Sequence, residues 1–102
     1  MEVIMVPEEK KMIHLNIIVS GKVQGVGFRF FAQRKAVQYG INGWVRNLDD
    51  GSVEIRAIGD KKQLDSFMRD LKRGNPFSAI DQMQVDELDG QGEQSSSFKI
   101  KY

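Results

Sequence analysis

The sequence contains no cysteine, one histidine and only two prolines in 102 residues. Without cysteine it has no disulfide framework, no thiolate nucleophile and no cysteine-ligated metal site. It also has no apolar run near the roughly 20 residues that span a bilayer. The short apolar stretch at residues 3–6 precedes charged residues instead of following them, which is unlike a signal peptide. We therefore expect a cytoplasmic protein with no membrane partner.

The chain also has little net charge. Its 15 lysines and arginines are balanced by 14 aspartates and glutamates, so the formal net charge is +1. Such a weak overall field does not draw a protein onto nucleic acid or an anionic membrane, so any anion site must be a local arrangement. The length and the 40% apolar content are typical of one small globular domain, and we expect a monomer.

Two kinds of periodicity organise the chain from residue 12 onward. Alternating apolar residues predict strands over 12–20, 41–48, 53–57, 78–88 and 98–102, and helical spacing predicts helices over 28–39 and 61–73. Asp60 and Gln63 match a capping box, and Asp50-Gly51 marks a hairpin turn. Residues 1–11 are expected to be a disordered extension before a domain over 12–102, with a mobile connection at 89–97.

The predicted order, βαββαβ with a short final strand, matches the split βαβ arrangement of ferredoxin-like domains. We predict an α+β open-faced sandwich in which two helices cover one face of a mostly antiparallel sheet of four or five strands. His14 alternates with the apolar positions of its strand, so it is expected on the uncovered face.

A glycine-rich segment, Gly21-Lys-Val-Gln-Gly-Val-Gly27, leads from the first strand into the first helix, whose first turn carries Arg29. Successive backbone N–H groups beside a helix N-terminus bind anions, and a guanidinium adds a bidentate contact to phosphate oxygens. The segment matches neither a Walker loop nor a dinucleotide fingerprint, so a nucleotide is not indicated. From the spacing alone, a flexible connection with a solvated arginine explains it equally well.

A second candidate is Gly43-Trp-Val-Arg-Asn47, at the end of the second predicted strand. The carboxamide of Asn47 can hold a water molecule, although asparagine is also common at strand ends for structural reasons alone. Arg46 and Asn47 alternate along the strand, so only one of them can face the same site as Arg29. Trp44 is interpreted as a core residue.

Other chemistries lack the residues they need. A Ser-His-Asp triad would have to use His14, in the middle of a strand, and a metal site would have one histidine and no cysteine. Phe28, Phe30 and Phe31 are predicted on a helix and not across a sheet face, where RNA-binding domains of this fold stack bases. Core packing is the better interpretation for at least two of the three phenylalanines.

Taken together, two segments resemble the two signature motifs of the acylphosphatase family: Ser20-Gly-Lys-Val-Gln-Gly-Val-Gly-Phe-Arg29, and Gly43-Trp-Val-Arg-Asn47-Leu-Asp-Asp-Gly51-Ser-Val53 followed by Gly59. The resemblance covers the chain from about residue 12 to its end. It implies a ferredoxin-like fold and an enzyme that hydrolyses the carboxyl-phosphate bond of acyl phosphates. The resemblance further implies that the products are a carboxylate and inorganic phosphate, and that neither a metal nor another cofactor takes part.

The resemblance also implies the roles of individual residues. Arg29 would bind the phosphate and Asn47 would orient the attacking water. The phosphate cradle would be completed by backbone amides, with Gln24 acting mainly through its backbone; these amides belong to Gln24, Gly25, Val26, Gly27 and Phe28. Leu48 stands where some members of the family carry a hydroxyl residue, so an accessory polar contact is not expected there.

Two other classes of function remain open. A non-catalytic phosphate- or anion-binding module acting through a protein partner would use the same loop, although the presence of both Arg29 and Asn47 favours the enzyme. An RNA-binding domain of similar fold would need a basic stripe, which a net charge of +1 does not favour. Nothing in the sequence indicates which acyl group is preferred.

Overall fold

The computed structural model describes residues 11–89 and 95–102. The predicted N-terminal extension, apart from its last residue, and the middle of the predicted connection at 89–97 therefore lie outside the described residues. Within the described ranges, neither helix has the length and apolar character needed to cross a membrane.

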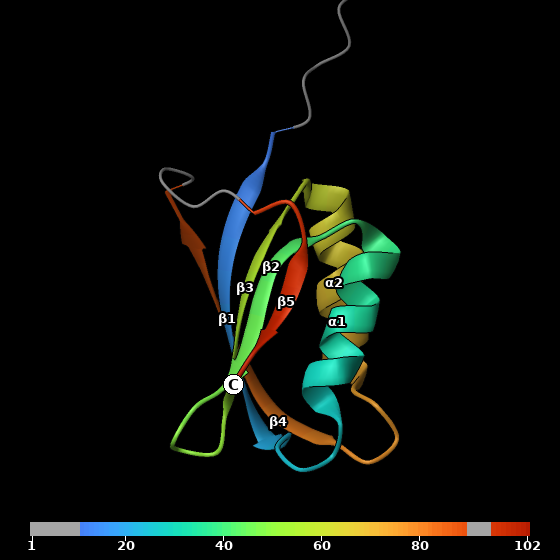
Figure 1. Ribbon diagram of the computed structural model, residues 1–102, viewed down its shortest axis with the longest axis vertical. Helices are drawn as coiled ribbons and strands as arrows, with labels where there is room; N and C mark the ends of the chain where they lie inside the picture. Colours follow the sequence, from blue (N-terminus) through green and yellow to red (C-terminus); the bar gives the residue numbers. More distant parts are fainter. Residues whose placement is uncertain (1–10, 90–94) are drawn as a thin grey trace, which may run out of the picture.

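Five strands form a single sheet, and two helices lie side by side on one of its faces (Figure 1). The elements in chain order are β1 (Ile13–Lys22), α1 (Phe28–Tyr39), β2 (Asn42–Asn47), β3 (Val53–Gly59), α2 (Lys61–Arg73), β4 (Ala79–Leu88) and β5 (Phe98–Lys101). The strand order across the sheet is β4-β1-β3-β2-β5. Neighbouring strands are antiparallel except β2 and β5, which are parallel. The predicted ferredoxin-like open-faced sandwich is confirmed.

The two helices begin in different ways. The Asp60 side chain accepts the Gln63 N–H and the Gln63 side chain accepts the Asp60 N–H, so the predicted capping box of α2 is confirmed. The residue before α1 is Gly27, in a left-handed conformation, and no side chain caps this helix. The first N–H groups of α1 are therefore not satisfied by a capping side chain.

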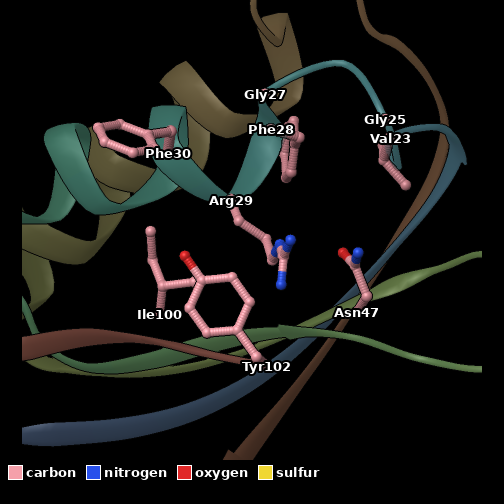
Figure 2. Close-up of a pocket in the computed structure, with 9 residues that line it drawn as sticks. All are labelled: Val23, Gly25, Gly27, Phe28, Arg29, Phe30, Asn47, Ile100 and Tyr102. Atoms are coloured by element: carbon pink, nitrogen blue, oxygen red, sulfur yellow. The ribbon is translucent and has the colours of Figure 1, made fainter.

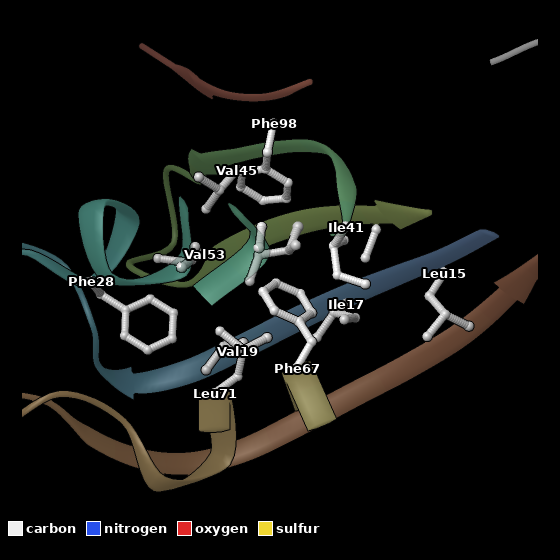
Figure 3. Close-up of a cluster of buried hydrophobic side chains, with 14 of the residues drawn as sticks. Leu15, Ile17, Val19, Phe28, Ile41, Val45, Val53, Phe67, Leu71 and Phe98 are labelled. Atoms are coloured by element: carbon white, nitrogen blue, oxygen red, sulfur yellow. The ribbon is translucent and has the colours of Figure 1, made fainter. Parts of the chain in front are cut away.

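The core lies between the helices and the sheet (Figure 3). Alternate residues of the central strands point toward the helices, and five of them are fully buried: Ile17, Val19, Val45, Val53 and Ile55. They pack against Phe28 of α1 and Phe67 and Leu71 of α2. His14 alternates with buried Leu15, which places it on the uncovered face as predicted.

Strand direction brings the candidate residues to one end of the sheet. β1 and β2 both pair antiparallel with β3, so their C-terminal ends lie at the same end. β5 runs parallel to β2 with Lys101 opposite Arg46, so the chain end at Tyr102 arrives there as well. The glycine-rich loop after β1, Asn47 and Tyr102 therefore meet beside the start of α1.

Asp70 is a buried carboxylate that links the two helices. It accepts a hydrogen bond from the Tyr39 hydroxyl at 2.6 Å, and the Lys35 Nζ lies 3.2 Å from the same oxygen. The hydrogen bond from Tyr39, followed by the interaction with Lys35, holds the pKa of Asp70 below its ordinary value of 3.8, although burial acts in the opposite direction.

Tyr39→Phe should make the protein less stable and its stability less sensitive to acid. Because the folded-state pKa of Asp70 is lowered, its ionisation stabilises the fold above the unfolded-state pKa, and this stability is lost as the pH falls through the folded-state pKa. The variant loses the larger cause of the shift. We expect the free energy of unfolding to fall by about 1–2 kcal/mol near neutral pH and to decline less steeply in acid. Urea unfolding over a pH series measures both.

Tyr102→Phe is the matched control, because it removes a hydroxyl from an exposed ring. An acid dependence of Tyr39→Phe equal to that of the wild type would contradict the role given to the Tyr39–Asp70 hydrogen bond.

Candidate functional site

A small pocket lies where the loop after β1, the first turn of α1 and the ends of β2 and β5 meet (Figure 2). Its volume is about 140 Å³, well below that of sites for drug-sized ligands and suited to a small group such as a phosphate. The residues around it are Val23, Gly25, Gly27, Phe28, Arg29, Phe30, Asn47, Ile100 and Tyr102. The fold thus brings the two candidates Arg29 and Asn47 to one cavity.

The loop that forms one wall of the pocket turns twice through left-handed backbone. Gly25 has φ 74° and Gly27 has φ 75°, a region that residues with a Cβ rarely adopt. A Cβ on Gly25 would meet no atom within 4 Å, so the backbone conformation and not lack of space requires glycine there. Turns of this kind, followed directly by an uncapped helix start, present successive N–H groups to an anion.

Arg29 extends from the first turn of α1 into the pocket. Its Nη1 donates a hydrogen bond to the Lys101 carbonyl oxygen at 3.2 Å, and its Cζ lies 4.7 Å from the centre of the Tyr102 ring. Both contacts orient the guanidinium without neutralising it, and among the described residues no carboxylate forms an ion pair with it. In Figure 2 the guanidinium lies between the Tyr102 ring and Asn47. Its positive charge is available to an anion.

Asn47 ends β2 on the side that faces the helices. Its Oδ1 is buried and has no hydrogen-bond partner among the described residues. A buried acceptor left in this state costs about 1–3 kcal/mol, so such atoms are rare unless a ligand or water uses them. Arg46 points to the opposite face and pairs with Glu54 at 2.6 Å. The prediction that only one of these two residues can join Arg29 is confirmed, and that residue is Asn47.

The side chain of Gln24 stabilises the loop that forms the site, a role that the sequence did not predict. Its Nε2 donates to the carbonyl oxygens of Leu48 and Ser52, both at 2.8 Å. These bonds tie the glycine-rich loop to the turn that follows Asn47. Because both acceptors are backbone atoms, no pattern of residue types could have indicated them.

The same turn is held by Asp50. Its Oδ1 accepts hydrogen bonds from the backbone N–H of Ser52 at 2.9 Å and from the Ser52 hydroxyl at 2.5 Å. The hydroxyl bond, then the backbone bond, lowers the pKa of Asp50, so its carboxylate stays ionised to a lower pH than an ordinary aspartate does.

Asn75, in the connection after α2, is a second contributor that sequence reasoning missed. Its Nδ2 donates to the Val26 carbonyl oxygen at 2.7 Å, across 49 positions of sequence. This bond ties the glycine-rich loop to the connection after α2. The sequence around Asn75 carries no signal for it, because the bond depends on where α2 ends relative to β1.

The structure corrects one aromatic interpretation and confirms another. Trp44 was expected in the core, but it alternates with buried Val45 and lies on the uncovered face. Three cationic side chains lie over its ring. The distance from the ring centre is 5.3 Å to Arg46 Cζ, 5.2 Å to Arg56 Cζ and 4.3 Å to Lys101 Nζ. The three helix phenylalanines behave as predicted, since Phe28 is buried and Phe31 packs against the core, while Phe30 is 63% exposed.

Comparison with known proteins gives a consistent result. Residues 15–100 match the acylphosphatase family model. An acylphosphatase of Bacillus licheniformis is 49% identical over 94 residues, which cover 89% of this chain and 100% of the relative. One from Archaeoglobus fulgidus is 44% identical over 91 residues, covering 89% of this chain and 100% of the relative.

Solved structures agree in fold. The crystal structure of acylphosphatase from Bacillus subtilis superimposes with a TM-score of 0.84 at 44% identity, covering 88% of this chain and 99% of that one. Full-length HypF, in a phosphate- and nucleotide-bound form, aligns with a TM-score of 0.80 at 31% identity. That alignment covers 95% of this chain but 13% of HypF, so a similar unit also occurs within a much longer protein.

Gln24→Leu should loosen the pocket by releasing the loop from the turn after β2. The substitution keeps the size of the side chain and removes two hydrogen bonds, so we expect a loss of about 1–2 kcal/mol in the free energy of unfolding. We also expect weaker binding of inorganic phosphate, measured by calorimetric titration.

Gln33→Leu is the control, because it removes a similar bond, from Gln33 Nε2 to the Phe98 carbonyl oxygen, at the other end of β5. Phosphate affinity that falls equally in both variants would show that the effect is general destabilisation and not a looser pocket.

Proposed function

The chain belongs to the acylphosphatase family and is an acylphosphatase; from this premise we propose how its residues carry out the hydrolysis. Arg29 and the backbone N–H groups of residues 24–28 hold the phosphoryl group of an acyl phosphate, and Asn47 orients the water that attacks it. One observation carries the proposal: a small pocket is lined by the glycine turns, by Arg29 and by the Oδ1 of Asn47, and within residues 11–89 and 95–102 neither a carboxylate pairs with Arg29 nor a hydrogen-bond donor reaches that oxygen.

The phosphoryl group is bound by positive charge and by the orientation of the hydrogen-bond donors around it. Backbone N–H groups at the start of α1 and the guanidinium of Arg29 match the negative charge on the three non-bridging oxygens. Because these groups are already oriented in the folded protein, they need no reorganisation as that charge develops in the transition state. The Tyr102 ring and the Lys101 carbonyl support this by restricting the guanidinium.

The proposed role of Asn47 is to position the attacking water. Its Oδ1 accepts a hydrogen bond from the water and so directs the water oxygen at phosphorus, which makes the attack effectively intramolecular. The bond from water oxygen to phosphorus forms as the bond from phosphorus to the acyl oxygen breaks. The acyl group leaves as a carboxylate, and the water proton passes to the phosphate product or to solvent.

This reaction makes few chemical demands on the protein. A carboxylate is a stable leaving group and needs no general acid, and a loose transition state needs little help from a base. We propose that no metal ion or other cofactor takes part, because Arg29 and the backbone dipoles supply the positive charge that a cation supplies in other phosphoryl-transfer sites.

The same residues also bear on the oligomeric state of the active protein. Arg29, Asn47 and the loop all belong to one chain, which supports a monomer as the active form. We propose that it works in the cytoplasm on small acyl phosphates, without a nucleic-acid or membrane partner, in keeping with a net charge of +1 and the absence of cysteine.

The direct test is hydrolysis of benzoyl phosphate by the purified protein in excess chelator. Turnover that chelator does not reduce is the expected result. Turnover that depends on added metal would overturn the metal-free mechanism. A folded protein without turnover would favour the alternative, a module that binds anions and acts through a protein partner.

Arg29→Ala should lose both phosphate binding and turnover. The guanidinium contacts the phosphoryl group in the bound substrate and in the transition state, so we expect kcat/KM for benzoyl phosphate to fall by about a hundredfold or more. Inhibition by inorganic phosphate should weaken in parallel. Circular dichroism checks folding, and a variant that retains phosphate inhibition would contradict the assigned role.

Asn47→Ala should separate binding from chemistry. Its carboxamide acts on the water and not on the phosphoryl group, so kcat should fall by about a hundredfold while competitive inhibition by inorganic phosphate stays near the wild-type value. Asn42→Ala, at the other end of β2, is the matched control and should retain turnover. An unchanged kcat in Asn47→Ala would refute the role in orienting water.

A further inference from the structure

A second and larger cavity adjoins the phosphate pocket. Its volume is about 450 Å³, and it shares Gly27 and Phe30 with the smaller pocket. One wall is α1 and the other is the connection between α2 and β4; the residues around it are Gly27, Phe30, Phe31, Arg34, Lys35, Gln38, Asn75, Pro76 and Phe77. We call this cavity the α1 groove. The proposed mechanism leaves it without a role.

The geometry of the reaction points the acyl group toward this groove. In phosphoryl transfer the attacking and leaving oxygens lie roughly in line on opposite sides of phosphorus. In Figure 2, Asn47 lies on one side of the Arg29 guanidinium and Phe30 lies on the other. With the phosphoryl group placed at the guanidinium, a water held by Asn47 directs the acyl oxygen to the side away from Asn47, where Phe30 and the α1 groove lie.

The apolar part of the groove is exposed to solvent. Phe30 is 63% exposed and Phe77 is 71% exposed, although residues of this size gain more when they are covered. A substrate body that packs between them would remove apolar surface from water. An acetyl group has only one methyl group to bury against these rings, whereas an aromatic or branched acyl group offers more apolar surface.

The charged part of the groove is positive. Lys35 is already bound to Asp70 at 3.2 Å. Arg34 lies one helical turn after Phe30 on the same side of α1, and within the described ranges it forms no ion pair or hydrogen bond. The residues lining the groove include no aspartate or glutamate. An anionic substituent on the acyl group would thus meet an available guanidinium.

We propose that the α1 groove is the acyl-binding site and that it selects acyl phosphates with a bulky apolar body carrying a second anionic group. This inference rests on the proposed function of the phosphate pocket. Phe30 and Phe77 contact the apolar body, and Arg34 contacts the anionic substituent. The phosphate pocket accepts any acyl phosphate, and the groove determines which acyl group is turned over efficiently.

Three substrates with the same phosphoryl group test the proposal: acetyl phosphate, benzoyl phosphate and 4-carboxybenzoyl phosphate. The wild type should prefer benzoyl over acetyl phosphate by about tenfold in kcat/KM, corrected for their uncatalysed rates, and should prefer the carboxylated substrate further. Phe77→Ala should lower the benzoyl-to-acetyl ratio about fivefold. Arg34→Gln should lower the carboxybenzoyl-to-benzoyl ratio about threefold.

Two control variants match these changes outside the groove. Val37→Ala shortens an exposed apolar side chain of α1 that lines neither cavity, and Lys62→Gln removes one positive charge at the start of α2. Both should leave the two substrate ratios as in the wild type. If Lys62→Gln lowers the carboxybenzoyl-to-benzoyl ratio as much as Arg34→Gln does, the effect is one of overall charge and the role of Arg34 is refuted.

The outcomes separate this proposal from the one on which it rests. A wild type that hydrolyses none of the three substrates refutes the proposed function itself. A wild type that hydrolyses all three, with substrate ratios unchanged in Phe77→Ala and Arg34→Gln, refutes the acyl-binding groove and leaves the phosphate pocket intact.

Discussion

The pairing of β1 and β2 with the strand between them is the constraint on which the site depends. Because both strands run antiparallel to β3, their C-terminal ends lie at the same end of the sheet. The glycine-rich loop and Asn47 therefore lie side by side. β3 supplies no residue to the pocket, yet its register sets the position of both walls. Gln24 then fixes the remaining separation through two hydrogen bonds from the loop to the turn after β2.

The proposed mechanism lets a nearly neutral protein bind a highly charged group. Overall charge plays little part at +1, so attraction has to come from local dipoles and one guanidinium. In the proposed site the backbone supplies the dipoles, because Gly25 and Gly27 have the left-handed conformation that occurs in anion-binding turns. The end of the chain restrains Arg29 through a carbonyl oxygen and a ring, neither of which cancels its charge.

The two adjoining cavities differ in a way that matches the two halves of an acyl phosphate. The smaller one, at about 140 Å³, is built from backbone and polar groups that suit a phosphoryl group. The larger one, at about 450 Å³, is lined by exposed phenylalanines and by cations. Phe30 lines both cavities. In the proposed mechanism, the first turn of α1 therefore separates recognition of the phosphoryl group from recognition of the acyl group.

The sequence by itself determined the helices and strands of the described residues, and it pointed to Arg29 and Asn47 as the candidate site residues. Alternation, the Asp60 capping box and the glycine turns depend on near neighbours, so they can be predicted from the chain. Only the tertiary structure decided that Trp44 faces outward, because Trp44 and Val45 are both apolar and alternation alone does not say which is covered. The contacts of Gln24 and Asn75 join side chains to distant backbone carbonyls, which carry no residue-specific signal in a sequence.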